Sequence, residues 1–231
     1  MATERIPTHI ALIPDGNRRW ADMKGLPHIE GHLAGANRMH TVVEELIKYG
    51  IKYLTIWGFS TDNWKRSREE IETIFQLTEE YIKQETPWLH ENGVKLRHLG
   101  HLDELPESLQ DAIVMAMDIT KGNQGMVLSL AFNYNGRDDI IDAVRHIISR
   151  GLKPRHTTKY LFAKYLSTNG MPDVDLVIRT AGEFRVSNFM LWQTAYSEYY
   201  FSNVFFPDFD IVELEKALKS YQARDRRFGG G

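Results

Sequence analysis

Arginines and small polar residues gather in four short segments of this 231-residue chain, and each segment follows a run of apolar residues. The segments are 15–20 (DGNRRW), 59–67 (FSTDNWKRS), 133–137 (NYNGR) and 179–188 (RTAGEFRVSN). Arginine, serine and asparagine side chains, together with the free amides at the start of a helix, are groups that hold phosphate oxygens. The four segments therefore predict a site for a phosphorylated ligand.

Asp15 is the one residue of the first segment that would repel a phosphate placed directly against it. It can instead share a magnesium ion with the phosphate, because Mg²⁺ prefers one or two carboxylates together with phosphate oxygens and water. We therefore predict that Asp15 is a metal ligand. In the alternative interpretation, Asp15, Gly16 and Asn17 form only a turn and the arginines are solvated.

The elements that must position these segments alternate between short apolar runs and longer stretches of helical period. Strands are expected at 9–13, 52–57, 94–99, 126–132 and 175–178, and helices at 35–48, 67–92, 106–120, 138–150, 157–166 and 211–223. This alternation predicts an α/β fold, one domain over residues 1–231, with a largely parallel central sheet and helices on both faces.

An open sheet of this kind binds ligands at the carboxyl ends of its strands, which is where the four segments lie. They would bring six arginines to one edge of the sheet: Arg18, Arg19, Arg66, Arg137, Arg179 and Arg185. The long helix at 67–92 adds an apolar stripe that faces either the core or a cavity, and Ser67 and Glu70 form a capping box at its start. Core packing is the more frequent role of such a stripe.

Composition excludes several classes of protein. With 28 Lys and Arg against 31 Asp and Glu, the net charge is −3, and 42% of the residues are hydrophobic, which excludes disorder and a generally basic nucleic-acid binder. The absence of cysteine excludes disulfides, cysteine-ligated metal centres and a thiol nucleophile. No signal peptide and no apolar run of membrane-spanning length is visible, so we expect a soluble, cytoplasmic protein.

Familiar phosphate-binding motifs are missing. The sequence contains neither G-x-x-x-x-G-K-[ST] nor a G-x-G-x-x-G after the first strand. It also lacks the DDxxD pattern of the all-helical trans-type prenyl synthases. The predicted site must therefore be built in another way.

Seven ordered blocks resemble the cis-prenyltransferase family over nearly the whole chain. They are HIALIPDGNRRWA, GHLAGA, GFSTDNWKRS, FNYNGR, DLVIRTAGEFRVSNFMLWQTAYSEYYF, FPDF and RRFGGG. The resemblance implies a homodimeric, Mg²⁺-dependent enzyme with a hydrophobic tunnel. Such an enzyme condenses isopentenyl diphosphate with an allylic diphosphate, such as farnesyl or geranylgeranyl diphosphate, into a cis-polyprenyl diphosphate. Gly58 would leave room for a medium or long chain, and a long lipid product implies transient contact with a membrane.

The same resemblance implies roles for individual residues. Asp15 and Asn63 would be catalytic, and Asp15 and Glu198 would hold Mg²⁺. The allylic diphosphate would be bound by Gly16, Asn17, Arg18 and Arg19, with Trp20, His28 and His32 nearby. The catalytic loop would contribute Ser60, Thr61, Asp62, Trp64 and Arg66. Isopentenyl diphosphate would be bound by Arg179, Arg185, Val186 and Ser187, helped by Arg227 and Gly229 of the partner subunit.

The reaction explains these residue types. Loss of the diphosphate leaves a carbocation and a highly charged leaving group, so cations around that group stabilise the departing charge. The new bond also requires loss of a proton, which the carbocation makes acidic. Asn63 or the departing diphosphate accepts or orients that proton, and a purely positioning role for Asn63 remains open.

Three departures from the family pattern leave the product open. His28 stands where many members carry an arginine, and Asn135 and Ala181 each replace a glycine. One alternative is therefore a single condensation that gives a short or branched product. A non-catalytic partner subunit is a further alternative, although such subunits typically lose the Asp-Gly-Asn residues that this chain retains.

Overall fold

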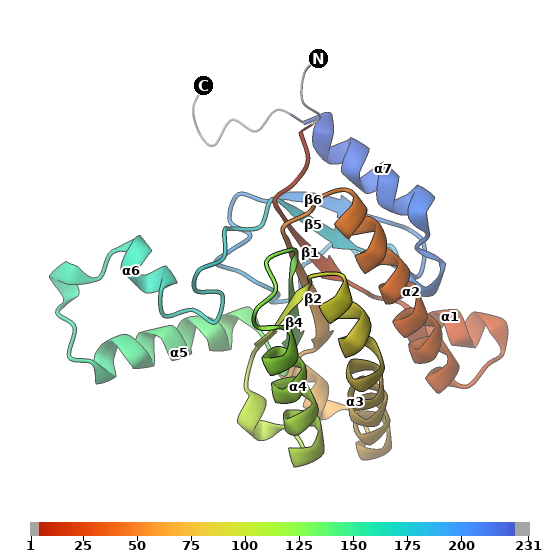
Figure 1. The fold of residues 1–231 in the computed structure, drawn as a ribbon, viewed down its shortest axis with the longest axis horizontal. Helices are drawn as coiled ribbons and strands as arrows, with labels where there is room; N and C mark the ends of the chain where they lie inside the picture. The colour runs from red at the N-terminus through yellow and green to blue at the C-terminus, as the bar shows by residue number, and fades with distance from the viewer. Residues whose placement is uncertain (1–4, 225–231) are drawn as a thin grey trace.

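A six-stranded sheet, all parallel, forms the centre of the computed structural model, which describes residues 5–224 (Figure 1). The strands are β1 (His9–Ile13), β2 (Tyr53–Phe59), β3 (Lys95–Leu99), β4 (Val127–Phe132), β5 (Leu176–Arg179) and β6 (Glu198–Phe201), in the order β3-β4-β2-β1-β5-β6. The predicted parallel sheet is thereby confirmed. The edge strand β6 was not predicted; it is only four residues long, and all four are half-buried.

Residues 5–224 contain seven α-helices, of which α7 follows the last strand. They are α1 (Asn17–Lys24), α2 (His28–Lys48), α3 (Arg68–Glu91), α4 (Glu107–Thr120), α5 (Gly136–Ser149), α6 (Lys159–Ala163) and α7 (Ile211–Gln222). Short 3-10 helices lie at Thr61–Lys65, Leu102–Glu104, Pro154–His156 and Phe206–Asp208. The prediction missed α1, where only Ala21 is buried and no apolar stripe is visible, and it started α2 seven residues too late.

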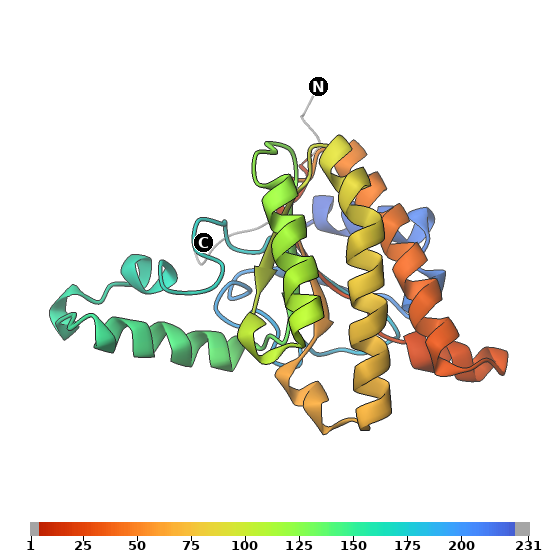
Figure 2. The same ribbon diagram turned by 60° about the horizontal axis from the view of Figure 1, so that its bottom comes forward.

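The two faces of the sheet are covered differently. Helices α2, α3 and α4 lie side by side over one face (Figure 2), and α7 joins them in the larger core cluster. That cluster includes Leu54, Ile74 and Phe132, whereas the smaller cluster on the other face is closed by Phe189 and Met190 of an irregular segment. The larger core cluster therefore lies on the side of α2, α3 and α4.

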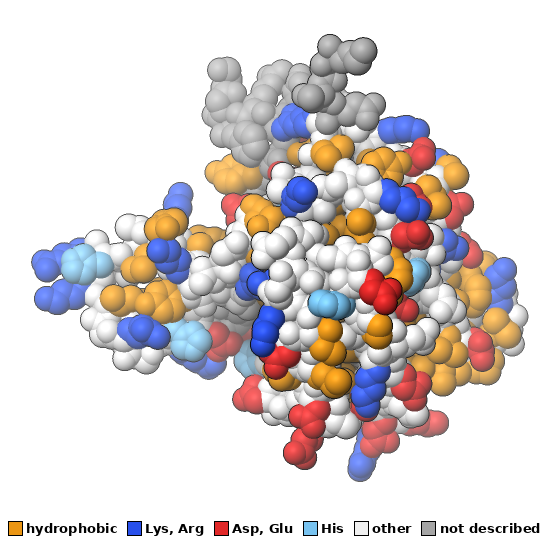
Figure 3. Space-filling model, viewed as in Figure 1, with side chains coloured by type: hydrophobic (Ala, Val, Ile, Leu, Met, Phe, Trp, Pro, Cys, Tyr) orange, Lys and Arg blue, Asp and Glu red, His pale blue; other side chains and the backbone are white. Residues whose placement is uncertain are grey.

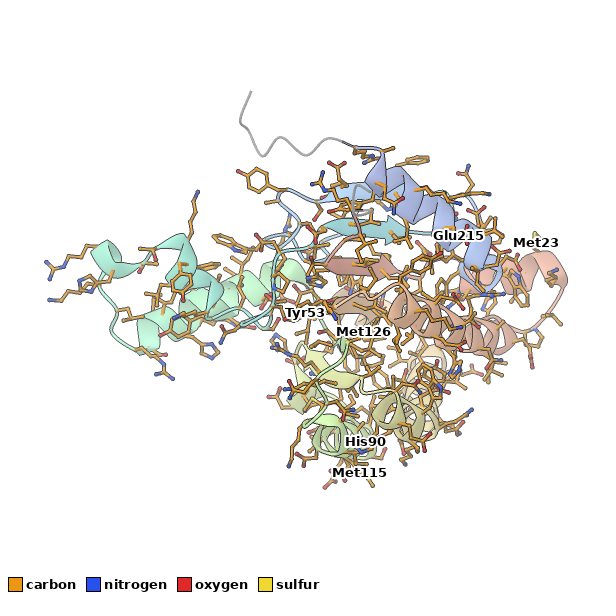
Figure 4. The ribbon with its side chains drawn as sticks, turned by 45° about the horizontal axis from the view of Figure 1, so that its top comes forward. Met23, Tyr53, His90, Met115, Met126 and Glu215 are labelled. Carbon is orange, nitrogen blue, oxygen red and sulfur yellow. The ribbon has the colours of Figure 1, made fainter. Side chains whose placement is uncertain are left out.

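Some large apolar side chains of the outer helices are exposed to solvent. Met23 at α1 and Met115 on α4 are both largely exposed, and Figure 4 shows them at the rim of the molecule. Helices α5 and α6 project from the body as an arm (Figure 1). Within the described residues, none of the helices combines the length and apolarity needed to cross a membrane.

His9 is completely buried in β1, at the amino end of the sheet. One ring nitrogen, Nδ1, donates to the carbonyl of Pro172 at 2.9 Å, and the other, Nε2, accepts from the Thr55 hydroxyl at 2.8 Å. Burial lowers the pKa of His9 from 6.5 to about 4, partly opposed by the Pro172 carbonyl and by Asp175. The folded chain therefore holds His9 neutral.

We expect His9 to make the protein less stable in acid. Because the unfolded chain takes up a proton at the ordinary histidine pKa and the folded chain does not, stability is lost as pH falls from 6.5 to about 4. The loss should total roughly 3 kcal/mol. Urea unfolding of the wild type and of His9→Gln across this range measures it. Equal pH slopes for the two proteins would contradict the assignment.

Candidate active site

The candidate site lies at the carboxyl ends of β1 and β5, where the chain leaves the two neighbouring strands in opposite directions across the sheet. Such a switch point leaves a crevice in an open α/β sheet. The register pairs Ile13 with Arg179, which brings Asp15 beside the end of β5. Arg179 donates to the Asp15 carboxylate at 2.8 Å. The Thr180 hydroxyl accepts from the Asp15 amide and donates to the Asp15 carbonyl.

Gly16 allows the chain to turn directly from β1 into α1. Its φ is +102°, in the region that favours glycine, and a Cβ there would lie 2.6 Å from Phe205 and 2.8 Å from the Ala181 methyl. No side chain caps the amino end of α1, and its first turn contains no acidic residue. The first-turn amides and the helix dipole therefore present positive charge beside Asp15, a setting that favours an anion.

The glycines of the GHLAGA block explain how α2 supports this turn. A Cβ at Gly31 would lie 2.1 Å from the backbone oxygen of Asn17, and one at Gly35 would lie 2.8 Å from its side-chain amide. Any larger residue would push the first turn of α1 away from α2. Within the described part of the chain, the buried Oδ1 atom of Asn17 has no hydrogen-bond partner.

Carboxylates neutralise the arginines of the site in two matching clusters. On α3, Glu70 accepts from Arg18 at 3.1 Å and from Arg66 at 3.0 Å. In the segment after β5, Glu183 accepts from Arg19 at 2.9 Å and also binds Arg185. Neither glutamate was predicted to belong to the site.

Arg179 is the most buried of these arginines, with 5% of its side chain exposed. Besides Asp15, it donates to the Arg185 carbonyl at 2.6 Å and to the Ser187 hydroxyl at 2.9 Å. Its Nε has no partner among the described residues. Arg179 thus orders the segment that carries Arg185 and Ser187.

Two adjoining cavities open at this crevice. The larger, about 510 Å³, has polar residues of α1 at one end and continues between α2, α3 and the sheet, lined by apolar side chains such as Met39, Ile74, Leu77 and Phe132. The smaller, about 280 Å³, is lined by polar residues that include Ser60, Asn63, Arg179 and Ser187. Both cavities are lined by Pro14, Asp15, Trp57, Gly58 and Arg66.

The apolar stripe of α3 faces both the core and a cavity, the two alternatives that the sequence left open. Ile74, Thr78 and Ile82 line the larger cavity, while Ile71 and Phe75 pack in the core. Half of the capping box predicted at Ser67 and Glu70 is present: the Ser67 hydroxyl accepts from the Glu70 amide, while the Glu70 carboxylate accepts from Arg18 and Arg66. Gly58 stands where a Cβ would lie 2.9 Å from Phe132, a residue of the cavity wall.

His32 lines the larger cavity from α2. Its Nε2 is buried and has no partner among the described residues. Burial is the main cause that lowers the pKa of His32 below its ordinary value, and the nearby Arg66 adds to the effect. A neutral ring with an unpaired nitrogen can therefore respond to an anion bound beside it.

The loop before α3 holds Asn63 in place. The side-chain oxygen of Asn63 accepts from the Ser60 amide at 2.9 Å, while the Ser60 hydroxyl accepts from the Asp62 amide at 3.2 Å. This reciprocal capping box fixes the loop against the smaller cavity. Since the Asn63 oxygen already accepts a hydrogen bond, its orientation is set by the loop itself.

Other predicted residues surround the cavities without lining them. Trp64 donates to Asn133 and packs edge-on against Phe59 and Phe75. Trp20 donates to Asp208 at 2.9 Å.

The remaining predicted residues of this group also have protein partners. His28 pairs with Asp22 at 2.8 Å, and Thr61 donates to Asp138 at 3.0 Å. Val186 packs against the smaller core cluster. These contacts support the site without placing the side chains against its cavities.

The structure does not bring Glu198 to Asp15 within one chain. Glu198 opens β6 and pairs with Leu176 at the amino end of β5, whereas Asp15 follows the carboxyl end of β1. The register puts Glu198 level with Ile10, so three residues of β1, about 10 Å, separate it from the strand end that Asp15 follows. Glu198 instead accepts from Arg224 at 2.6 Å. The predicted contributions of Arg227 and Gly229 lie outside the described residues.

Arg137 is the exception among the six arginines predicted to share the edge. It is exposed and lines neither cavity, because it lies in the first turn of α5, and its backbone amide donates to the side chain of Asn188. The other five belong to the clusters around Asp15, Glu70 and Glu183.

Two departures from the family pattern have structural consequences. Asn135 caps α5 by accepting from the Asp138 amide at 2.9 Å, and its side-chain amide donates to Thr61 of the loop that carries Asn63. Ala181 adopts φ +71°, a left-handed conformation that costs a residue with a Cβ about 1–2 kcal/mol. Its methyl packs against Gly16.

The chain is similar to known proteins over nearly its whole length. The family model described as putative undecaprenyl diphosphate synthase matches residues 13–229. An isoprenyl transferase of Clostridium perfringens is 47% identical over 98% of this chain and 91% of its own length. One from Fusobacterium nucleatum is 46% identical over 98% of this chain and 97% of its own.

Two solved structures extend the comparison. Lavandulyl diphosphate synthase from Lavandula x intermedia, in complex with dimethylallyl diphosphate, superimposes with a TM-score of 0.93 at 38% identity, over 97% of this chain and 98% of that one. A probable undecaprenyl diphosphate synthase from Campylobacter jejuni gives a TM-score of 0.82 at 30% identity, over 97% and 99%.

We predict that His32 takes up a proton when pyrophosphate binds, because a nearby anion raises a pKa that the ligand-free chain holds low. Pyrophosphate affinity should therefore rise as pH falls from about 8 to about 6. Calorimetric titration of wild type and His32→Asn separates this effect from the titration of pyrophosphate itself. The same pH dependence in both proteins would exclude His32 as the proton acceptor.

Proposed function

The chain belongs to the undecaprenyl diphosphate synthase family of isoprenyl transferases, and on this premise we propose that it is a Mg²⁺-dependent cis-prenyltransferase that makes a medium or long polyprenyl diphosphate. In this proposal it joins isopentenyl diphosphate to an allylic diphosphate such as farnesyl or geranylgeranyl diphosphate. The proposal concerns the substrates, the metal and the product length.

The observation that carries the proposal is the wall that the two cavities share. Asp15, Gly58 and Arg66 line both the large, mainly apolar cavity and the small, polar one. A condensation between two diphosphates needs two such sites whose reacting carbons meet, because orientation supplies much of the rate of a two-substrate reaction. The larger cavity suits the allylic substrate, and the smaller suits isopentenyl diphosphate.

In the larger cavity, the allylic diphosphate would lie on the first turn of α1. The amides after Gly16, the guanidinium groups of Arg18 and Arg19, and His32 supply donors there. The hydrocarbon tail would run between α2 and α3 toward Leu89. Burial of the tail adds affinity in proportion to the apolar area removed from water.

The extent of this cavity favours a long product. Its lining on α3 reaches from Ile74 to Leu89, fifteen residues along the helix. At 1.5 Å per residue this corresponds to about 22 Å. Gly58, at the reacting end, leaves this path open.

The donor set at Asp15 fits a magnesium ion that is bound together with substrate. Within the described residues, no group of three or more acidic, histidine or cysteine side chains could hold a metal. Mg²⁺ is commonly held by one or two carboxylates, with phosphate oxygens and waters completing its shell. Asp15, with 31% of its side chain exposed beside the cavities, would supply that carboxylate, and the ion would neutralise diphosphate charge.

Bond breaking would be driven by the positive groups around the leaving diphosphate. Arg19, Arg66 and the α1 amides face the space where negative charge accumulates. Their preorganisation stabilises that charge more in the ionised state than in the intact substrate.

The proton lost by isopentenyl diphosphate would leave beside the smaller cavity. Asn63 lies there with its oxygen held by the Ser60 amide, which favours a positioning role for this side chain. The departing diphosphate, held by the arginines, is then the stronger proton acceptor.

We also propose that the enzyme is a homodimer built on the α5–α6 arm. The arm exposes Ile141, Val144, Ile148 and Tyr160, and Figure 3 shows hydrophobic side chains along it. Exposed apolar side chains on a projecting helix favour a second copy of the chain as cover.

A single condensation is the second candidate. It is favoured by the likeness to lavandulyl diphosphate synthase, and it fits the same site if the cavity beyond the first isoprene unit stays unused. Product length distinguishes the two candidates.

Incubation with labelled isopentenyl diphosphate, Mg²⁺ and several allylic primers tests the proposed function. We expect products extended by several units that elute as a medium or long series on reversed-phase chromatography. A product of one added unit would favour the second candidate, and no extension with any primer would reject the proposal.

Asp15→Asn tests the metal ligand. Turnover should fall by about a hundredfold or more, because the metal would lose its carboxylate while the Arg179 contact can persist through the amide oxygen. Asp118→Asn, which alters an exposed acid on α4, is the matched control. Full activity of Asp15→Asn, or an unchanged Mg²⁺ requirement, contradicts the assignment.

Ile148→Glu tests the dimer. This side chain is 70% exposed, so the charge is tolerated in a monomer but not in an apolar interface. Light scattering should report a dimer for the wild type and monomers for the variant. Met115→Glu, on α4, is the control and should stay dimeric. A monomeric wild type contradicts the proposal.

A further inference from the structure

Glu183 lies between Arg19, which the proposed function places on the allylic diphosphate, and Arg185, which the family resemblance assigns to isopentenyl diphosphate. Its Oε1 accepts from Arg19 of α1 at 2.9 Å, and its Oε2 binds Arg185 of the segment after β5. The two arginine side chains are 45% and 60% exposed, so both are otherwise accessible to a ligand. The single carboxylate of Glu183 therefore pairs with both guanidinium groups.

These contacts place Glu183 beside the centre of the site. Arg19 also approaches Asp15 at 3.4 Å and lies over the Phe205 ring. Arg185 contributes its carbonyl to the buried Arg179. The arginine pair holds the pKa of Glu183 below its ordinary value, with Arg185 as the larger cause, so this acid is ionised at neutral pH.

Glu183 lies outside the helices and strands of the site. It follows Ala181 and Gly182, whose φ angles are +71° and +70°, in a segment without regular structure. A Cβ built at Gly182 would meet only Asn203, at 3.5 Å. Glu70, which joins Arg18 and Arg66, is instead fixed in the first turn of α3.

A carboxylate that bridges two guanidinium groups uses the donors that phosphate oxygens would use. A ligand diphosphate and the Glu183 carboxylate cannot both take the same donors of Arg19 and Arg185. The Glu183 carboxylate and a bound diphosphate therefore compete for the same two arginines.

We propose that Glu183 is an internal competitor of the diphosphates: it holds Arg19 and Arg185 in the empty site, yields them to substrate, and returns to them as pyrophosphate leaves. The inference rests on the proposed function, because it concerns the same site. Competition by Glu183 weakens diphosphate binding and thereby speeds the release of pyrophosphate.

Calorimetric titration with inorganic pyrophosphate tests this competition without turnover. Glu183→Gln keeps the shape of the side chain but loses its charge. Pyrophosphate should therefore bind at least about fivefold more tightly, because the variant removes one or two exposed ion pairs that compete with it. Product inhibition by pyrophosphate should strengthen by a similar factor. Glu72→Gln, which breaks an exposed pair with Arg68 on α3, should change neither.

A structural role for Glu183 gives the opposite result. If the carboxylate only orders the two arginines, Glu183→Gln weakens pyrophosphate binding, and weaker or unchanged binding overturns the inference. Glu183→Asp, too short to reach both arginines, should bind pyrophosphate more tightly than wild type, and it carries the test if Glu183→Gln does not fold. Failure of the wild type to bind pyrophosphate rejects the proposed diphosphate site itself, and this inference with it.

Discussion

The ion pair between Asp15 and Arg179 is the contact on which the site depends. A guanidinium group that is almost completely buried is costly without an anion, and removing one partner of such a pair is strongly destabilising. Because Arg179 ends β5 and Asp15 follows β1, the pair joins two strands at the switch point of the sheet. The same guanidinium fixes the segment that carries Ser187. The pair of Asp15 and Arg179 thus fixes the structure of the crevice. Glu70 and Glu183 neutralise the other arginines around it.

Close packing of α1 against α2 shapes this crevice. Gly16 admits a left-handed turn, while Gly31 and Gly35 let α2 approach the first turn of α1 at distances that no side chain would allow. The amino end of α1 is thereby held beside Asp15, with an apolar cavity directly behind it between α2 and α3. In the proposed function, diphosphate recognition and hydrocarbon burial would both depend on this one helix contact, which suits a ligand that is charged at one end and apolar along its length.

The sequence predicted the parts of this arrangement that depend on local pattern. Apolar runs identified five of six strands, and the polar residues after them identified Asp15, Arg19 and Arg179. It could not predict contacts set by packing between distant elements. Glu70 and Glu183 look like ordinary surface acids until α1 is placed against them, although the spacing of Arg66 and Glu70 on one turn was a usable signal. The distance between Glu198 and Asp15 could not be predicted for the same reason: a motif gives residue types, but only the register of β6 tells which end of the sheet they occupy.

A crystal structure with Mg²⁺ and an unreactive allylic thiodiphosphate tests the central claim most directly. The account predicts the diphosphate on the first turn of α1, a metal ion between it and Asp15, and the hydrocarbon tail in the cavity between α2 and α3. A ligand whose diphosphate lies away from Asp15 and Arg19, or whose tail lies outside that cavity, would contradict it.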